Sequence, residues 1–144
     1  MLVQQILKAK GSDKVVTVTP ATSVSEAARV LSEHRIGGLV VSPDGRAIVG
    51  ILSERDIVRS LALRGPGCLD ETVEALMTRN PVCCAGDDTA DAVLGRMTDG
   101  RFRHMPVVAD AALVGIITIG DVVKARLDEL HMEKEALKGM IMGY

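Results

Sequence analysis

Two short stretches of the chain carry the same pattern of chemically useful residues. Residues 50–56 read GILSERD and residues 115–121 read GIITIGD, so the two copies lie 65 residues apart (115 − 50). In each copy a glycine precedes a short apolar run, a hydroxyl residue follows the run, and an aspartate stands three positions after the hydroxyl. The residues that follow each aspartate have the spacing of apolar positions that is typical of a helix. Each copy therefore predicts a buried strand that leads directly into a helix.

The hydroxyl residues are Ser53 and Thr118, and the carboxylates are Asp56 and Asp121. The first turn of a helix has free N–H groups and the positive end of the helix dipole, so it can bind an anion. A carboxylate at this place can accept two hydrogen bonds from the vicinal hydroxyls of a ribose. The same spacing also fits a capping box, which only satisfies the backbone of the helix end. Capping explains either copy alone, but it does not explain why both copies share the preceding Gly-Ile strand.

Other patterns of reactive residues are weak. P-loop and His-Glu-x-x-His spacings are absent, and Gly37-Gly38 is too short for a dinucleotide fingerprint. The acidic group Asp87, Asp88 and Asp91 could suggest a divalent metal, but it stands at a predicted helix start, where the helix dipole favours acids. The three cysteines have no ligand spacing and are interpreted as structural thiols. We therefore expect neither an enzyme nor a metal site.

The composition argues against several classes of partner. Seventeen basic and nineteen acidic residues give a net charge of −2, with no long run of one sign, so we expect no nucleic acid partner. The N-terminus lacks a basic region and a cleavage site, and no apolar run approaches the roughly 18 residues of a membrane span. The sequence predicts a cytoplasmic protein with no membrane partner. With one Phe, one Tyr and no Trp, a flat ligand would lie between aliphatic and Met side chains.

The elements around the two stretches also repeat. In the first half we expect a helix over 2–9, a strand over 15–18, a helix opened by the capping box at Ser23, a hairpin over 39–52 and a helix over 53–63. In the second half we expect a strand over 81–84, a helix over 88–99, a hairpin over 105–117 and a helix from 118 to about 139 or beyond. A helix over 70–78 connects the halves. Val107 matches Val41 at an offset of 66, and the offset falls to 65 after the second, shorter turn.

Each half therefore reads β-α-β-β-α, and the fold class is α/β (α+β). We divide the chain into residues 1–68, which hold the N-terminal helix and the first repeat, and residues 69–144, which hold the connecting helix, the second repeat and an extended C-terminal helix. A unit of about 50 residues buries too little surface to be stable alone. We expect the two units to pack their hairpin faces together as a pseudo-two-fold pair, with clefts where they meet.

The chain resembles a tandem pair of cystathionine-β-synthase-type (CBS) domains over roughly residues 14–128. The resemblance rests on residues 50–56 and 115–121, together with 36–41 (IGGLVV) and 103–108 (RHMPVV), in the same order in each half. With its flanking helices the chain is similar to small stand-alone bacterial members of the family.

The resemblance implies a regulatory module, not an enzyme, that binds an adenosine compound (AMP, ADP, ATP, NAD(H) or S-adenosylmethionine) in its clefts. Such a module requires no cofactor beyond this regulatory nucleotide. The resemblance also implies a homodimer that signals to an unidentified regulated protein. The alternative is a structural dimerisation module with no physiological ligand.

The resemblance also implies roles for particular residues. Asp56 and Asp121 match the ribose-binding aspartate, Ser53 and Thr118 match the hydroxyl that contacts ribose or phosphate, and Arg55 matches a phosphate-binding arginine. Gly120 stands where Arg55 stands in the first copy, so the second cleft lacks that cation and the two sites should differ in affinity.

Further candidates for nucleotide binding lie beside the strands that enter the clefts. Arg103 and His104 are expected to replace the missing cation, and Ile36 and Gly37 are taken as their equivalents in the first half. Met105 is expected either to pack on a purine face or to fill the core. The remaining candidates are Lys14, Val16, Gly38 and Pro106.

Overall fold

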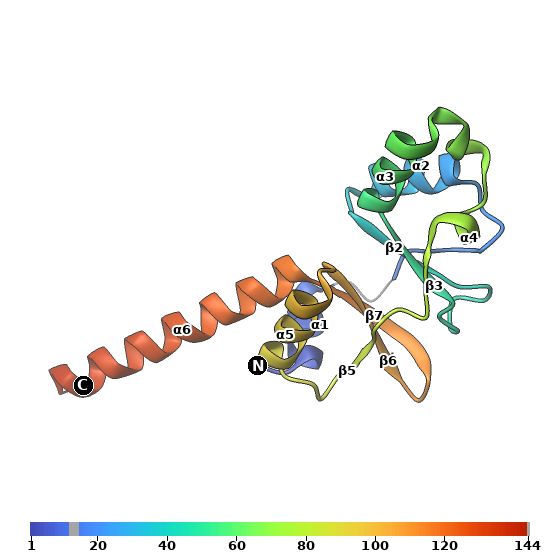
Figure 1. Cartoon of the computed structure of the whole chain (residues 1–144). Coiled ribbons are helices and arrows are strands. Elements are labelled where there is room, and N and C mark those ends of the chain that lie inside the picture. Colours follow the sequence, from blue (N-terminus) through green and yellow to red (C-terminus); the bar gives the residue numbers. More distant parts are fainter. Residues whose placement is uncertain (12–14, 144) are drawn as a thin grey trace.

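The computed structural model of the chain describes residues 1–11 and 15–143 and shows two lobes and one long projecting helix (Figure 1). The elements of the first half are β1 (Thr17–Val18), α2 (Val24–His34), β2 (Gly38–Val41), β3 (Gly50–Ser53), α3 (Glu54–Arg64), the 3₁₀ helix η1 (Pro66–Asp70), α4 (Val73–Leu76) and β4 (Thr78–Arg79). Those of the second half are β5 (Cys84–Ala85), α5 (Ala90–Gly100), β6 (His104–Ala109), β7 (Ala112–Thr118) and α6 (Ile119–Met142), and α1 (Val3–Lys10) precedes both. The predicted fold class with two β-α-β-β-α units is confirmed.

Each half forms its own sheet, with strand orders β1-β2-β3-β4 and β5-β6-β7. The first strand of each half lies parallel to the central strand, and the returning strand lies antiparallel to it. The predicted strands over 15–18 and 81–84 are shorter or shifted in the structure. β3 also begins only at Gly50, and before it the carbonyl of Arg46 accepts a hydrogen bond from the backbone N–H of Leu113 (2.9 Å), in the other repeat.

The helix starts follow the local sequence. Ser23, Ser53, Thr89 and Thr118 each accept a hydrogen bond from the backbone N–H three residues later, which satisfies one of the free donors of the first turn. The hairpin between β6 and β7 turns through Asp110 and Ala111, whose φ angles are 51° and 62°. Positive φ at both central residues gives the tight turn whose twist suits a hairpin.

The predicted connecting helix over 70–78 is wrong in extent. The segment breaks between η1 and α4, because the backbone N–H groups of Val73 and Glu74 donate to the carbonyls of Thr22 (2.8 Å) and Pro20 (3.1 Å) in the first repeat. These tertiary bonds take the donors of the helix start and hold α4 against the first repeat. A helix that continued through residues 71 and 72 could not make them.

The N-terminal helix α1 is the counterpart of α4 in the second repeat. The N–H of Val3 donates to the carbonyl of Asp88 (2.9 Å), just as that of Val73 donates to Thr22, and Asp88 follows Thr22 by the repeat offset of 66 (88 − 22). The grouping of the N-terminal helix with the first repeat within 1–68 is therefore corrected by its packing. In space, α1 completes the second repeat and α4 completes the first, although the chain order suggests the opposite.

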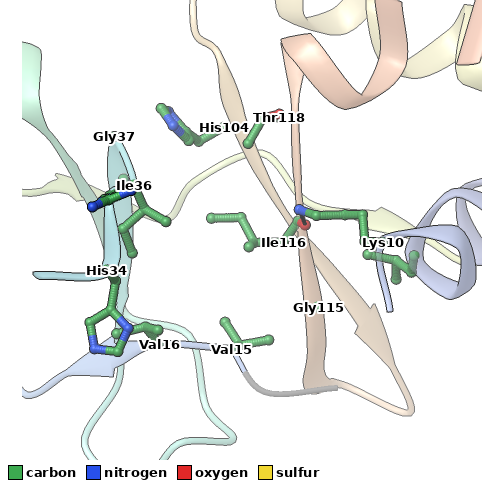
Figure 2. Close-up of a pocket in the computed structure, with 13 residues that line it drawn as sticks. Lys10, Val15, Val16, His34, Ile36, Gly37, His104, Gly115, Ile116 and Thr118 are labelled. Carbon is green, nitrogen blue, oxygen red and sulfur yellow. Dashed lines mark hydrogen bonds between the residues drawn. The ribbon is translucent and has the colours of Figure 1, made fainter. Parts of the chain in front are cut away.

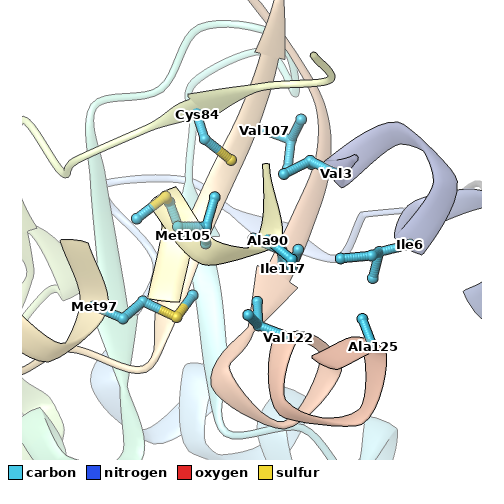
Figure 3. Close-up of a cluster of buried hydrophobic side chains, with 11 residues drawn as sticks. Val3, Ile6, Cys84, Ala90, Met97, Met105, Val107, Ile117, Val122 and Ala125 are labelled. Atoms are coloured by element: carbon cyan, nitrogen blue, oxygen red, sulfur yellow. The ribbon is translucent and has the colours of Figure 1, made fainter. Parts of the chain in front are cut away.

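Each repeat has its own apolar core. In the second repeat, side chains from α1, α5, β6, β7 and α6 meet on one face of the sheet (Figure 3). The buried residues of this core are Val3, Ile6, Cys84, Ala90, Val93, Met97, Met105, Val107, Ile117, Val122 and Ala125. In the first repeat, Leu39, Val41 and Leu52 pack against α2, α3 and α4 in the same way.

The opposite faces of the two sheets meet each other. Val40 and Pro106 alternate with core residues along β2 and β6, and both are buried although neither belongs to its own repeat's core. The strand register pairs Gly38 with Ser53 and His104 with Thr118. Gly38 is therefore the equivalent of His104, at the offset of 66, and the predicted pairing of Ile36 and Gly37 with Arg103 and His104 is wrong by one residue.

Candidate functional site

Two clefts lie between the repeats, one at the start of each motif helix. The first, which we name the Thr118 cleft, encloses about 420 Å³ and is lined by Lys10, Gly115, Ile116 and Thr118 on one side and by Val15, Val16 and residues 34–38 on the other (Figure 2). The second, the Ser53 cleft, encloses about 320 Å³ and is lined by Ile51, Ser53, Arg55, Asp56, Arg59, Thr78 and residues 80–82 and 100–104. Each cleft thus combines the motif of one repeat with the strand entrance of the other.

The motif residues adopt a capping box in both clefts. The N–H of Ser53 donates to Asp56 Oδ2 (2.8 Å), and the N–H of Thr118 donates to Asp121 Oδ2 (2.9 Å). In return, the N–H groups of the two aspartates donate to the hydroxyls at 3.4 Å and 3.1 Å. The capping interpretation is therefore confirmed. It uses Oδ2 of each carboxylate and leaves the ribose role as a prediction.

Asp121 has a second partner that the sequence analysis missed. Lys10 Nζ on α1 donates to Asp121 Oδ2 (2.8 Å) and to the carbonyl of Ile116 (3.2 Å). Burial alone would raise the pKa of Asp121, but the hydrogen bonds from Lys10 and from the backbone of Thr118 outweigh it, and the pKa lies below its ordinary value. Lys10 therefore supplies a cation to the Thr118 cleft and holds the aspartate charged.

His104 lines both clefts, because it stands at the centre of the interface between the repeats. A Cβ on Gly38 would lie only 2.8 Å from Cγ and Cδ2 of the His104 ring, so the imidazole packs directly on the glycine backbone. Burial lowers the pKa of His104, nearby Arg103 lowers it further, and Glu54 opposes the shift. A neutral imidazole is thus favoured, and it can offer one donor and one acceptor to a ligand.

The Ser53 cleft is rich in arginine. Arg55, Arg59, Arg101 and Arg103 line it, and Asp56 is the carboxylate among its lining residues. Arg103 lines the Ser53 cleft and pairs with Glu54 (3.2 Å). Contrary to the expectation from the sequence, it does not replace the missing cation of the Thr118 cleft. Arg59 lies 3.8 Å from Asp56.

Nine lining residues of the Ser53 cleft were not identified from the sequence, and four of them have charged, amide or aromatic side chains that suit ligand binding. These four are Arg59, Arg101, Asn80 and Phe102. Phe102 is the chain's one phenylalanine, and that was the available signal. The other three stand in positions with no local motif.

The remaining candidates divide between cleft and core. Val16, Ile36, Gly37 and Gly38 line the Thr118 cleft. Met105 is fully buried in the core of the second repeat, so of its two expected places the structure selects the core. Pro106 is buried between the sheets, and Lys14 lies outside the described residues.

Other kinds of site have no support in the described part of the chain. Within residues 1–11 and 15–143, no group of three or more His, Cys, Asp or Glu side chains is placed to hold a metal ion. Burial raises the pKa of the Cys84 thiol to about 12, as suits a structural thiol. No helix in these ranges has the length and hydropathy needed to cross a membrane. The predicted cytoplasmic location stays a prediction.

Comparison with known proteins decides the family. The profile of the CBS domain matches residues 6–63 and 73–128, which correspond to the two repeats. The chain belongs to the CBS domain family. A CBS-domain containing protein from Agrobacterium tumefaciens is 44% identical, with a TM-score of 0.83 over 88% of this chain and 99% of its own.

Two further solved structures are complexes with adenosine compounds. The CBS domain pair of protein MJ0100, in complex with 5′-methylthioadenosine and S-adenosyl-L-methionine, is 31% identical to this CBS pair, with a TM-score of 0.78 over 90% of this chain and 98% of its own. A CBS domain protein from Pyrobaculum aerophilum complexed with AMP is 25% identical, with a TM-score of 0.73 over 84% of this chain and 89% of its own.

Proposed function

We propose that this CBS pair is a regulatory module that binds an adenosine-containing compound in the clefts between its repeats. The observation that carries the proposal is the duplicated cleft at the start of a motif helix. Ser53 and Asp56 line one copy, Thr118 lines the other with its capping partner Asp121 beside it, and the opposite wall of each comes from the other repeat. Two related CBS proteins hold adenosine compounds. CBS-domain proteins are in general regulatory, which supports a sensor and not a catalyst.

The chemistry of each cleft suits the parts of a nucleoside. In the Thr118 cleft, Val16, Ile36 and Ile116 provide aliphatic surface for a purine. Asp121 would accept hydrogen bonds from the ribose hydroxyls, and the N-terminal turn of α6 would face the 5′ substituent. In the Ser53 cleft, Phe102 adds an aromatic ring, so the flat base need not rest on aliphatic side chains alone.

The two clefts should prefer different 5′ substituents. Four arginines line the Ser53 cleft, and guanidinium groups bind phosphate oxygens in a bidentate manner. The Thr118 cleft has fewer cations: a single arginine, Arg35, and Lys10, whose charge is already engaged by Asp121. The Ser53 cleft therefore suits AMP, ADP, ATP or NAD(H). The Thr118 cleft suits a less anionic compound, such as S-adenosylmethionine.

Calorimetric titration of nucleotide-free protein with AMP, ATP, NADH and S-adenosylmethionine tests the proposal. ATP binding should weaken at least tenfold in Asp56→Asn and in Arg55→Gln, while Asp121→Asn should leave it nearly unchanged. Asp99→Asn is the matched control, because Asp99 is an exposed acid on α5 outside both clefts. Equal effects of Asp56→Asn and Asp121→Asn would contradict the assignment of ATP to one cleft.

Thermal unfolding gives an independent measurement. A ligand at about 100 times its dissociation constant stabilises the fold by about 2.7 kcal/mol, which raises Tm by several degrees in a chain of this size. If none of the four compounds binds or stabilises the nucleotide-free protein, the alternative holds, and the chain is a structural dimerisation module.

A further inference from the structure

The C-terminal helix α6 extends well beyond the repeat that it belongs to. It spans Ile119–Met142, and its first turns are anchored by Val122 and Ala125, which are buried in the second core. Beyond these turns the helix leaves the body of the protein and projects away from both sheets (Figure 1). Packing within the chain therefore does not explain the apolar residues on its outer part.

Those apolar residues form a stripe that is interrupted once, by Lys134, and we name it the α6 seam. Its members alternate at spacings of four and three residues, as in the core of a coiled coil, and they are Val123, Leu127, Leu130, Lys134, Leu137 and Ile141. The five apolar members are 42 to 77% exposed. The seam lies on a different side of the helix from Val122 and Ala125, so the anchored face and the seam do not compete.

We propose that the α6 seam pairs with the α6 seam of a second copy of this chain as a parallel two-stranded coiled coil. A seam of five aliphatic residues and one lysine is too apolar to remain in water along a projecting helix. The regular heptad spacing identifies the partner as another helix with the same repeat. The copy itself supplies such a helix.

The charges beside the seam determine the orientation. In a parallel pair, Glu133 of each copy lies opposite Lys138 of the other copy, which gives two attractive contacts. In the antiparallel alignment that superimposes the same seam, with Val123 opposite Ile141, Glu133 meets Glu133 and Lys124 meets Lys138. Like charges at these positions are repulsive, so the parallel pair is favoured.

The lysine within the seam is compatible with this pairing. In the parallel register Lys134 lies opposite Lys134 of the second copy. A polar residue at one core position fixes the register and the number of strands at a cost in stability. The long stem of Lys134 can cover the seam while its ammonium group reaches Glu133 of the second copy. The inference does not depend on ligand binding in either cleft.

Cysteine cross-linking of the full chain tests both the pairing and its orientation. Leu137→Cys places two thiols opposite each other only in the parallel pair, because the antiparallel alignment puts residue 137 against residue 127. Met132→Cys is the matched control, since Met132 is 66% exposed on the same helix but lies outside the seam. Under mild oxidation, Leu137→Cys should form a covalent dimer in high yield, and Met132→Cys and the wild type should form little.

Light scattering of the same proteins completes the test. The wild type should have twice the mass of the 15.3 kDa chain, and Leu130→Glu with Leu137→Glu should weaken association at least tenfold, while Met132→Glu should not. A monomeric wild type would show that the seam does not pair two copies of this chain. A dimer that resists the double substitution, or equal cross-linking at residues 132 and 137, would show that association uses another surface. Each of these three results would overturn the proposal.

Discussion

Replacement of Gly38 by alanine should destabilise the protein through a clash at the centre of the interface between the repeats. The backbone of Gly38 permits any residue, because Gly38 is not among the glycines with positive φ in the described chain. The added Cβ would, however, lie 2.8 Å from Cγ and Cδ2 of His104 and 3.1 Å from Nδ1. Ordinary contact between such atoms requires about 3.5 Å or more.

The magnitude follows from which atoms clash. Cγ is the ring atom that is bonded to Cβ of His104, so the imidazole cannot avoid the new methyl group by moving only its far end. Either the ring changes rotamer or the two sheets separate. Overpacking of this kind costs about 1–3 kcal/mol. For a chain of this length, the corresponding fall in Tm is roughly 3–10 °C.

Thermal and urea unfolding of a double-mutant cycle would measure the effect. In a His104→Ala background the ring is absent, so Gly38→Ala should cost almost nothing, and the coupling free energy should equal most of the single-mutant loss. Gly95→Ala is the control, because Gly95 is exposed on α5 with no atom within 4 Å of the new Cβ, and this change should stabilise the helix by about 0.5–1 kcal/mol. An equal loss of stability from Gly38→Ala with and without the His104 ring would refute the clash.

Two other perturbations test the surroundings of the clefts. The pKa of Asp121 is lowered in the folded state, so its stabilisation is complete above its unfolded value of about 3.9 and is lost as the pH falls. In Lys10→Met the effect of burial on the pKa of Asp121 is less opposed, so this pKa should rise. Urea unfolding between pH 3 and 6 should then show the loss of stability beginning at a higher pH than in the wild type. An unchanged dependence of stability on pH would contradict the ion pair. Gly50→Ala should cost more than Gly115→Ala in thermal unfolding, because the new methyl at Gly50 meets the backbone carbonyl of Thr78 at 3.0 Å, whereas at Gly115 it meets only the flexible tip of a leucine on α1. The opposite order would contradict the contacts assigned to the two glycines.

The sequence by itself determined the local structure and the duplication. Capping hydroxyls such as Ser53 and Thr118 act on N–H groups only three residues away, so the helix starts were predictable from short patterns. The shorter second turn was also visible in the sequence, as a one-residue deletion between the two hairpins, and the chain turns there through Asp110 and Ala111. The order of the motifs within each half was enough to predict the family and the clefts between the repeats.

The tertiary structure alone decided which residues of distant segments meet. Nothing in the local sequence of α1 shows that it completes the second repeat, or that Lys10 would reach Asp121, 111 residues away. The sequence comparison also paired His104 with Gly37, one position away from its true equivalent.

In a strand, an error of one residue exchanges the core face for the interface, because side chains alternate between the two faces of a sheet. The same alternation placed Met105 in the core and its neighbours His104 and Pro106 at the interface between the repeats. These assignments depend on register and packing between segments far apart in the chain. Short-range patterns carry no information on either.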